Sequence, residues 1–321
     1  MKCRLTVILG NYNYAHYLPF CLDALIDQTR PADEIIVVDD ASTDNSVEVI
    51  SRYLSRHPNI RLVKNAVNMR PNHNVNALSK VAQGDIVHFA PSDDIVYPTL
   101  FERGMALMEE NPTAALFSAQ THAIDANSAM IGLFHAPQPL PRPGYLDPAG
   151  CARALMRDGP WFLGNTLLFR RETLIAEGGF PPHLAAIADS YICQKLTLKY
   201  GACYTPEVLG GWRRIRQGAS WSTSASLDAA TRVAAQCVEE MVKTPEVFPP
   251  GYPERWRARY LFGARRVILS EDVRAVPPDR PLRRMAMRLR ELVMTAWLML
   301  TMRPRDALTV VARRLRGLLA G

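Results

Sequence analysis

The sequence lacks the cysteine patterns of a metal-bound or disulfide-bonded domain. It has no CxxC and no cluster of cysteine with histidine, and its six cysteines lie far apart, at Cys3, Cys21, Cys151, Cys193, Cys203 and Cys237. Neither a zinc site nor a disulfide framework is expected. The pattern favours reduced cysteines in a cytosolic compartment.

The signatures of three other enzyme classes are missing after the first apolar run, LTVIL (5–9). The following GNYNYAH contains no GxGxxG of a dinucleotide-dependent oxidoreductase, no glycine-rich basic loop of a nucleotidyltransferase and no nucleophilic aspartate of a haloacid-type phosphatase. Only MKCR precedes the run, which is too short for a signal-peptide core. We therefore expect none of these classes and no secretion.

What the sequence does have is apolar content and an uneven charge. With 321 residues, of which 48% are hydrophobic, the chain can fill the core of one large domain or two smaller ones. Its net charge of +7 arises in the segment 280–316, where ten arginines and two acidic residues give a local charge of +8. The remainder is nearly neutral, so nucleic-acid binding is not expected and the basic segment needs a separate explanation.

Apolar runs and helical periodicities alternate over the first 90 residues. EIIVV (34–38) is a continuous apolar strand of the kind that is buried on both faces of a parallel sheet. Strands are expected at 4–9, 34–38, 60–64 and 85–89, and helices at 17–28, 47–54 and 74–82. These βα units predict an α/β fold with a mainly parallel sheet flanked by helices, which binds ligands at the carboxyl ends of its strands.

Polar clusters follow three of these strands. GNYN (10–13) follows the first, DDASTD (39–44) the second and SDD (92–94) the fourth. Any one of them could be a helix cap, but two contain adjacent carboxylates whose repulsion needs a cation or hydrogen-bond donors. Together they predict a binding site at one rim of the sheet.

Several motifs of this region occur together in one enzyme family. They are the Tyr-Asn turn after the first strand, EIIVVDDASTD (34–44), SDDIVYP (92–98), GGF (178–180) with Asp189, and WRR (212–214). On these motifs residues 4–222 resemble a family 2 glycosyltransferase with the Rossmann-like GT-A fold. The resemblance implies an inverting enzyme that moves a sugar from a nucleotide diphosphate to an acceptor hydroxyl.

The resemblance also implies a divalent cation, Mn²⁺ or Mg²⁺, at the carboxylate pair Asp93 and Asp94. Such ions prefer oxygen ligands and commonly take one or two carboxylates together with substrate phosphates. The D-x-D pattern of the family would place its first carboxylate at Pro91, so Asp93 is predicted to be the main ligand. Asp94 is either a second ligand or a residue that supports the site from behind or caps a helix.

The nucleotide pocket is predicted over the first two polar loops. By the resemblance, Asp39 accepts hydrogen bonds from the base, Asp40 orients its loop, and the donor is a UDP- or dTDP-sugar. Further donor contacts are predicted from five residues, Gly10, Tyr12, Asn13, Arg70 and Ser92. The family commonly has proline and threonine where this sequence has glycine and asparagine at 10–11, which leaves the identity of the base open.

Inverting transfer needs a base that removes the proton of the acceptor hydroxyl. The family has this base after GGF, in an acidic pair that opens a helix, and here the pair reads Ala188-Asp189. Asp189 is therefore predicted to be the catalytic base. The alternative is a structural role as the N-cap of a helix at 190–200.

Two arginines and two tryptophans are further candidates for substrate contact. Arg214 and Arg216 match a family loop that closes over the donor phosphates, with Arg216 in place of a histidine, and are predicted to contact the diphosphate from a mobile lid. Trp161 and Trp212 either stack on an acceptor sugar or lie in the core.

Beyond residue 225 the composition changes to helical, arginine-rich segments. Helices are expected at 227–242 and 257–269, and two amphipathic helices after residue 282. The uncharged run 292–302 has eleven residues, whereas a span needs about 20. The amphipathic helices predict contact with a membrane surface, the alternative being packing on the catalytic body or on a partner subunit, as in a homodimer.

These observations predict a GT-A domain at 1–225, with a nucleotide-sugar half at 1–98 and an acceptor half at 99–225, and a helical extension at 226–321. The predicted function is metal-dependent transfer of a sugar to a glycan or lipid-linked acceptor in cell-envelope polysaccharide or lipopolysaccharide assembly, at the inner face of the cytoplasmic membrane. The alternative is a non-catalytic sugar-nucleotide-binding protein, because Pro91 and Ala188 replace two family carboxylates.

Overall fold

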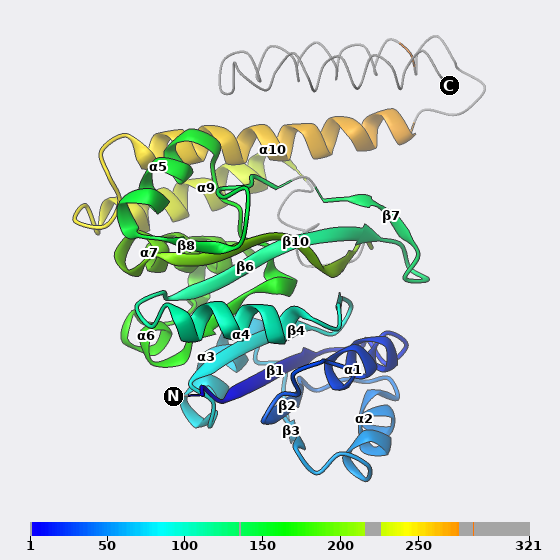
Figure 1. The fold of residues 1–321 in the computed structure, drawn as a ribbon. Helices are drawn as coiled ribbons and strands as arrows, with labels where there is room; N and C mark the ends of the chain where they lie inside the picture. The colour runs from blue at the N-terminus through cyan, green and yellow to red at the C-terminus, as the bar shows by residue number, and fades with distance from the viewer. Residues whose placement is uncertain (1, 135, 216–225, 276–284, 286–321) are drawn as a thin grey trace. The chain divides into compact units, whose positions relative to one another are not determined.

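The structure is a computed structural model that describes residues 2–134, 136–215, 226–275 and 285. The chain divides into two units, one of residues 1–155 and 160–216, the other of residues 156–159 and 217–321. The first unit contains a ten-stranded sheet in the order β3-β2-β1-β4-β9-β6-β10-β5, with β7 paired to β6 and β8 to β10 (Figure 1).

The N-terminal half of the sheet is parallel. β1 pairs with β2 on one side and with β4 on the other, and β3 lies beyond β2. The chain therefore moves outward from β1 to β3 and returns to the opposite side of β1, which creates a topological switch point between β1 and β4. The elements are β1 (Leu5–Asn11), α1 (Leu18–Ile26), β2 (Glu34–Asp39), α2 (Ser46–Leu54), β3 (Ile60–Lys64), α3 (Pro71–Val81) and β4 (Ile86–Pro91).

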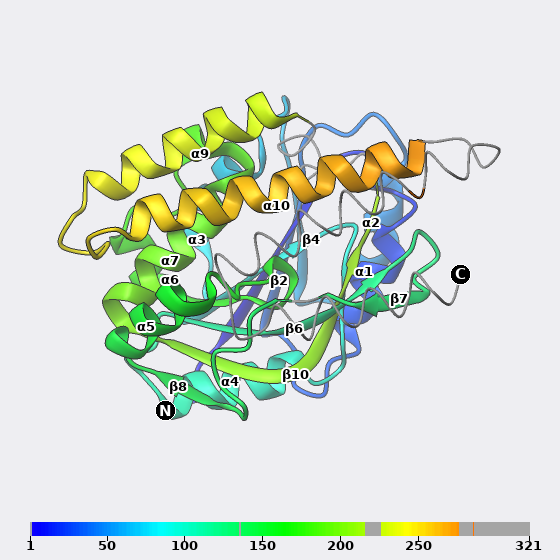
Figure 2. The same ribbon diagram turned by 90° about the horizontal axis from the view of Figure 1, so that it is seen from above.

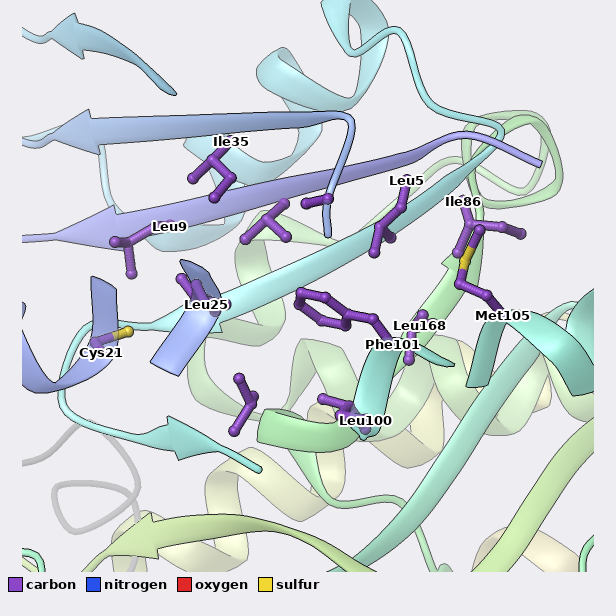
Figure 3. Close-up of a cluster of buried hydrophobic side chains, with 14 of the residues drawn as sticks. Leu5, Leu9, Cys21, Leu25, Ile35, Ile86, Leu100, Phe101, Met105 and Leu168 are labelled. Atoms are coloured by element: carbon purple, nitrogen blue, oxygen red, sulfur yellow. The ribbon is translucent and has the colours of Figure 1, made fainter. Parts of the chain in front are cut away.

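The core of this half follows from the apolar strands. Every residue of β2 is buried, and for Ile35 to Val38 this is what the apolar run predicts. One face of β1 packs against α1 and α4, where Leu5 and Leu9 lie in one cluster with Leu25 and Phe101 (Figure 3). This cluster fixes the strands and leaves their carboxyl ends to carry polar loops.

The C-terminal half of the sheet is mixed. β9 runs antiparallel to both β4 and β6, whereas β10 runs parallel to β6, and β5, β7 and β8 are antiparallel to their neighbours. The elements are β5 (Ile95–Val96), α4 (Leu100–Glu110), β6 (Leu116–Ile124), β7 (Met130–Leu133), β8 (Gly144–Leu146), α5 (Pro148–Asp158), η1 (Gly164–Thr166), β9 (Leu168–Arg170), α6 (Arg171–Ala176), η2 (Pro182–Ile187), α7 (Ala188–Tyr200) and β10 (Ala202–Arg213).

The described part of the second unit is helical. α9 (Leu227–Val242) begins after Ser226, whose hydroxyl accepts a hydrogen bond from the Ala229 amide (3.1 Å), and α10 (Tyr252–Ala275) lies beside it (Figure 2). α9 buries four small or apolar side chains, Ala230, Ala234, Cys237 and Met241. No helix in the described ranges is long and apolar enough to cross a membrane.

The strand and helix predictions for the first 90 residues are confirmed, with shifted boundaries. α3 begins at Pro71 rather than at Asn74, because proline is favoured in the first turn of a helix and the preceding Arg70 adopts a positive φ of 73°. α9 has the predicted bounds, and α10 begins before and ends after the predicted 257–269. The predicted helices beyond residue 282 lie outside the described residues, apart from Met285.

Candidate functional site

The polar loops predicted to form a site lie at one rim because of the strand register. At the switch point Gly10 of β1 is paired with Pro91 of β4, and Asn11 is paired with Asp39 of β2. The segments that follow the three strands therefore start side by side. The structure places all predicted site residues between Gly10 and Asp94 on these three strand ends or, for Arg70, on the neighbouring start of α3.

The loops after β1 and β2 are joined by hydrogen bonds. Asn11 Nδ2 donates to Asp39 Oδ1 (3.0 Å), and the Ser42 amide donates to Asp39 Oδ2 (3.1 Å). Asn13, with a φ of 59°, accepts a hydrogen bond from the Thr43 amide (2.7 Å) through its side-chain oxygen. The pair of loops is thus a fixed platform, and Tyr12 stands on it with 46% of its surface exposed.

Asp40 serves the neighbouring loop. Its carboxylate accepts hydrogen bonds from Asn65 Nδ2 (2.7 Å) and from the amides of Met69 (2.8 Å) and Arg70 (3.0 Å). Burial raises the pKa of Asp40, but these donors outweigh it and the pKa is lowered. The carboxylate therefore stays ionised and holds the start of α3, where the Arg70 side chain is exposed.

The turn after β4 carries excess negative charge. Asp94 is buried and accepts a hydrogen bond from the Arg213 amide (2.7 Å), and burial together with the charge of Asp93 raises its pKa well above the ordinary value. Burial also raises the pKa of the half-buried Asp93, and the positive charge of Arg213 offsets part of this effect. Ser92, also buried, precedes the pair. The turn is therefore suited to attract a cation.

Tyr14, which sequence reasoning did not select, lies close to this turn. Burial and the charges of Asp93 and Asp94 raise the pKa of its phenol to about 12. The two carboxylates therefore lie within electrostatic range of Tyr14, because the effect of a charge falls off within about 10 Å. The only sequence signal for Tyr14 is its place in the NYNY repeat.

Asp189 lies in the first turn of α7. The helix begins at Ala188 with Ile187 at its N-cap, so the alternative reading of Asp189 as an N-cap is wrong, and the 3₁₀ turn η2 leads directly into the helix. The carboxylate is exposed, yet the surrounding protein raises its pKa by desolvation, while the Ser190 amide (2.6 Å) opposes this. This combination is expected of a group at the floor of a concave surface.

The short helix η1 links Asp189 to the carboxylate pair. Asp189 Oδ2 lies 4.0 Å from the position that a Cβ of Gly164 would occupy. The next residue, Asn165, lines a small cavity together with Asp94. The structure therefore places the predicted base close to Gly164, and Asp94 on the same cavity as the neighbouring Asn165.

The same cavity reaches a buried histidine. His88 Nδ1 lies 2.8 Å from the Leu167 carbonyl oxygen, burial lowers the pKa of the ring to about 4, and the ring is therefore neutral at pH 7. Its Nε2 has no hydrogen-bond partner within the described residues, although it is buried. A water molecule in the cavity is the ordinary solution for such an atom.

The basic and aromatic candidates of the C-terminal half behave differently from one another. Arg214 is exposed, and Arg216 lies outside the described residues. Trp161 is fully buried, so its side chain belongs to the core and the sugar-stacking alternative is wrong for it. Trp212 is half-buried and meets Phe134 edge to face, with 4.9 Å between ring centroids.

The side chains at this rim supply only some of the ligands that a divalent cation needs. In the described ranges no group of three or more His, Cys, Asp or Glu side chains is arranged to hold a metal. Asp93 and Asp94 supply two carboxylates, which suits an ion that keeps water and substrate phosphates as its other ligands. The pair therefore fits Mg²⁺ or Mn²⁺ that arrives with a diphosphate.

Comparison with known proteins identifies the first half of the chain. Residues 6–158 match the family model described as Glycosyl transferase family 2. These residues form a glycosyltransferase family 2 domain. An uncharacterised glycosyltransferase of Escherichia coli, YibD, is 40% identical over 108 residues, which is 34% of this chain and 31% of that protein. A poly(ribitol-phosphate) beta-glucosyltransferase of Bacillus spizizenii is 32% identical over 111 residues, 34% of this chain and 18% of that protein.

Solved structures extend the fold of the family 2 domain over most of the chain. TarS of S. aureus (residues 1–349), solved with UDP-GlcNAc, has a TM-score of 0.61 at 17% identity and covers 94% of this chain and 82% of that one. The mannosyltransferase PcManGT of Pyrobaculum calidifontis, solved with GDP-Man and Mn²⁺, has a TM-score of 0.60 at 21% identity, covering 97% and 84%. The predicted GT-A fold is confirmed. The chain spans 31%, 18% and 39% of the length of three curated relatives that it matches.

Proposed function

We propose that the chain transfers a sugar, with inversion, from a nucleotide-diphospho-sugar to an acceptor hydroxyl. The observation that supports the proposal is that the platform at Asp39 and the carboxylate pair Asp93–Asp94 lie at the carboxyl ends of the two strands that flank β1, with the Asp189 carboxylate close to Gly164 of η1. A nucleotide, a diphosphate and an acceptor each need one of these groups. Membership of the first half in a glycosyltransferase family supports the same reaction class.

The donor half of the site would bind the nucleotide on the platform. Tyr12 offers an exposed ring for stacking, and the buried Asp39 carboxylate can accept an N–H of the base. Both features suit UDP or dTDP. Relatives with the same fold are described with UDP-GlcNAc and with GDP-Man, so a guanine donor is the competing candidate in the test.

The acceptor half would depend on Asp189. The pKa of Asp189 is raised, which makes its carboxylate a stronger base. A general base works best when its pKa is close to the operating pH. Asp93, with Asp94 behind it, would hold the divalent cation, which would act as a Lewis acid on the diphosphate leaving group. Arg70 and Arg214, both exposed, would add positive charge near the phosphates.

The biological setting follows from the relatives. One is named for glucosylation of poly(ribitol-phosphate) and another for teichuronic acid biosynthesis. We propose the assembly of a cell-envelope polysaccharide or lipopolysaccharide, with a glycan or lipid-linked acceptor, and peripheral contact with the inner face of the cytoplasmic membrane. The amphipathic segments that carry the membrane part of this proposal lie outside the described residues.

A second candidate is a sugar-nucleotide-binding protein without turnover. It is favoured by Pro91 and Ala188, which stand where the resemblance places two carboxylates. Under this hypothesis the platform would bind the nucleotide, and the remaining carboxylates would not support transfer.

The test compares donor turnover by the wild type and by Asp189→Asn. UDP-glucose, UDP-GlcNAc, dTDP-rhamnose and GDP-mannose are screened by thermal shift and then assayed for nucleotide release, with Mn²⁺ or EDTA and with candidate acceptors. Loss of a general base lowers turnover by roughly 10²- to 10⁴-fold. We expect this loss in Asp189→Asn, with nucleotide binding retained, and no loss in Asp27→Asn, which changes an exposed aspartate at the end of α1. Nucleotide binding without turnover in every protein would favour the second candidate.

A further inference from the structure

Arg213, the last residue of β10, is buried with 2% of its surface exposed, although arginine is rarely buried without partners. Its Nε donates to the Asp93 carbonyl oxygen (2.6 Å), and its Nη1 donates to the carbonyl oxygens of Asp125 (2.7 Å) and Ala126 (3.0 Å). Its Nη2 donates to Ser128 Oγ (2.8 Å). The sequence pattern predicts a role for Arg214 in this segment and contains no signal for Arg213.

These contacts join two segments that are distant in sequence. Asp93 belongs to the turn after β4, which carries the carboxylate pair, and the Arg213 amide binds Asp94 of the same turn (2.7 Å). Residues 125–128 form the turn of the β6–β7 hairpin. A single side chain therefore holds the carboxylate turn from one side and the hairpin turn from the other.

The guanidinium of Arg213 uses most of its hydrogen-bond donors in these contacts. An arginine has five N–H donors, and four hydrogen bonds of Arg213 end on backbone oxygens or on Ser128. Its face stacks on the ring of Tyr17, with 4.5 Å from Cζ to the ring centroid, at the start of α1. A group that is buried and bonded in this way does not reach a substrate, so it acts by placing other residues.

The hairpin that it anchors has an exposed outer strand. All four residues of β7 are exposed, and Met130 and Ile131 expose 64% and 55% of their surface. β7 pairs with β6, and β6 ends at the same side of the sheet as its parallel neighbour β10. The hairpin therefore extends an exposed apolar strand from the side of the sheet where Arg213 binds the carboxylate turn.

We propose that Arg213 is a positioning residue that couples the Asp93–Asp94 turn to the β6–β7 hairpin, so that the two segments are rigid or mobile together. The inference rests on the proposed function, in which the turn serves the donor and the cation. In this arrangement the hairpin and the carboxylate pair become more rigid or more mobile together. A contact that makes the hairpin more rigid therefore also makes the donor side of the site more rigid.

The test uses Arg213→Lys, which keeps the charge but loses the planar fork. Arg170→Lys is the matched control, because Arg170 also donates to two backbone carbonyls, those of Ala114 (3.1 Å) and Met108 (3.0 Å), away from this rim. In Arg213→Lys we expect hydrogen exchange to rise roughly tenfold in both 92–98 and 125–134, and in neither segment of the control. A rise in only one segment, or in neither, would overturn the proposal.

Ser128→Ala is a second variant that keeps Arg213 and removes one of its three hydrogen bonds to the hairpin turn, the other two being those to the Asp125 and Ala126 carbonyl oxygens. We expect faster exchange in the carboxylate turn as well as in the hairpin. If the change is confined to the hairpin, the two segments are not coupled and the proposal is wrong. This variant also decides the question if Arg213→Lys does not fold.

Manganese binding separates positioning from a general loss of structure. Free Mn²⁺ is measured by electron paramagnetic resonance in the presence of UDP, and again with GDP. Displacing a group that orients a metal ligand weakens metal binding by roughly 10- to 100-fold. We expect such a loss in Arg213→Lys and unchanged binding in Arg170→Lys, and equal binding in both would overturn the proposal. If the wild type binds no Mn²⁺, the metal part of the proposed function fails, while the exchange data still decide the coupling.

Discussion

Replacement of Asp93 by asparagine should stabilise the metal-free protein and weaken its response to Mn²⁺. The carboxylates of Asp93 and Asp94 are on adjacent residues, and burial raises the pKa of both. Two unit charges about 4 Å apart repel by roughly 1 kcal/mol in water and about 4 kcal/mol at an effective dielectric constant of about 20. Asp93 is half-buried and Arg213 offsets part of the repulsion, so we expect a gain of roughly 2 kcal/mol, which raises Tm by about 4–8 °C.

The pH dependence of this gain has a defined sign. The folded protein holds the proton of Asp93 more tightly than the unfolded chain, because its pKa is raised. The metal-free wild type therefore loses stability as the pH rises from the ordinary aspartate range through the raised pKa. Asp93→Asn lacks this loss, so the difference in Tm should be largest at neutral pH and should vanish near pH 3.

The assay is differential scanning calorimetry of both proteins in EDTA and in Mn²⁺ with UDP. The wild type should gain Tm with Mn²⁺ and UDP because a ligand that binds only the folded state stabilises it, and Asp93→Asn should gain less. Asp27→Asn, a change at an exposed aspartate, should behave as the wild type does. A lower Tm of Asp93→Asn in EDTA at pH 7, or equal gains with Mn²⁺, would refute the reasoning.

Three further variants test other parts of the structure. Burial raises the pKa of Glu177, but hydrogen bonds from two lysines and a tyrosine outweigh this effect and lower the pKa to about 2. Glu177→Gln should therefore lower the free energy of unfolding at pH 7 by on the order of 3 kcal/mol, as measured by urea unfolding. This loss should become smaller as the pH falls from about 4.5 towards 2. Ala185 has a φ of 46° and a ψ of −123°, which glycine adopts with less strain, so Ala185→Gly should raise the free energy of unfolding by roughly 1 kcal/mol; a decrease would show that the strain is absent. Asp40→Ala should weaken UDP binding by roughly tenfold in calorimetric titration, because the amides of Met69 and Arg70 lose their acceptor; unchanged affinity would mean that their loop does not serve the nucleotide.

The sequence was sufficient for the parallel half of the fold because its signals are local. The four residues IIVV (35–38) are apolar without interruption, and such a run is typical of a strand that is buried on both faces of a parallel sheet. The polar residues at the carboxyl ends of the strands then follow from the topology of a parallel sheet. For this reason Asp39 and Asp93 could be assigned to one rim from spacing alone.

The missed features depend on contacts between distant residues. Arg213 is the first of two adjacent arginines in WRR, a pattern that suggests exposed side chains. Nothing nearby in the sequence indicates that residues 125–128 supply the acceptors of its hydrogen bonds. The start of α7 was misjudged by two residues because η2 leads into the helix without a polar cap. Trp161 could be stacking or buried by composition, and only the packing shows that it is buried.

Gly164 leaves open space beside Asp189, the proposed base. A methyl group at this position would stand 4.0 Å from Asp189 Oδ2, in contact with the oxygen that is proposed to receive the acceptor proton. Its backbone does not need a left-handed conformation, so side chains can be introduced there without the strain that glycine positions often carry. Larger side chains at position 164 should therefore restrict which acceptors fit beside Asp189. In the series glycine, alanine, valine we expect fewer acceptor hydroxyls to be used, with nucleotide binding at the platform unchanged.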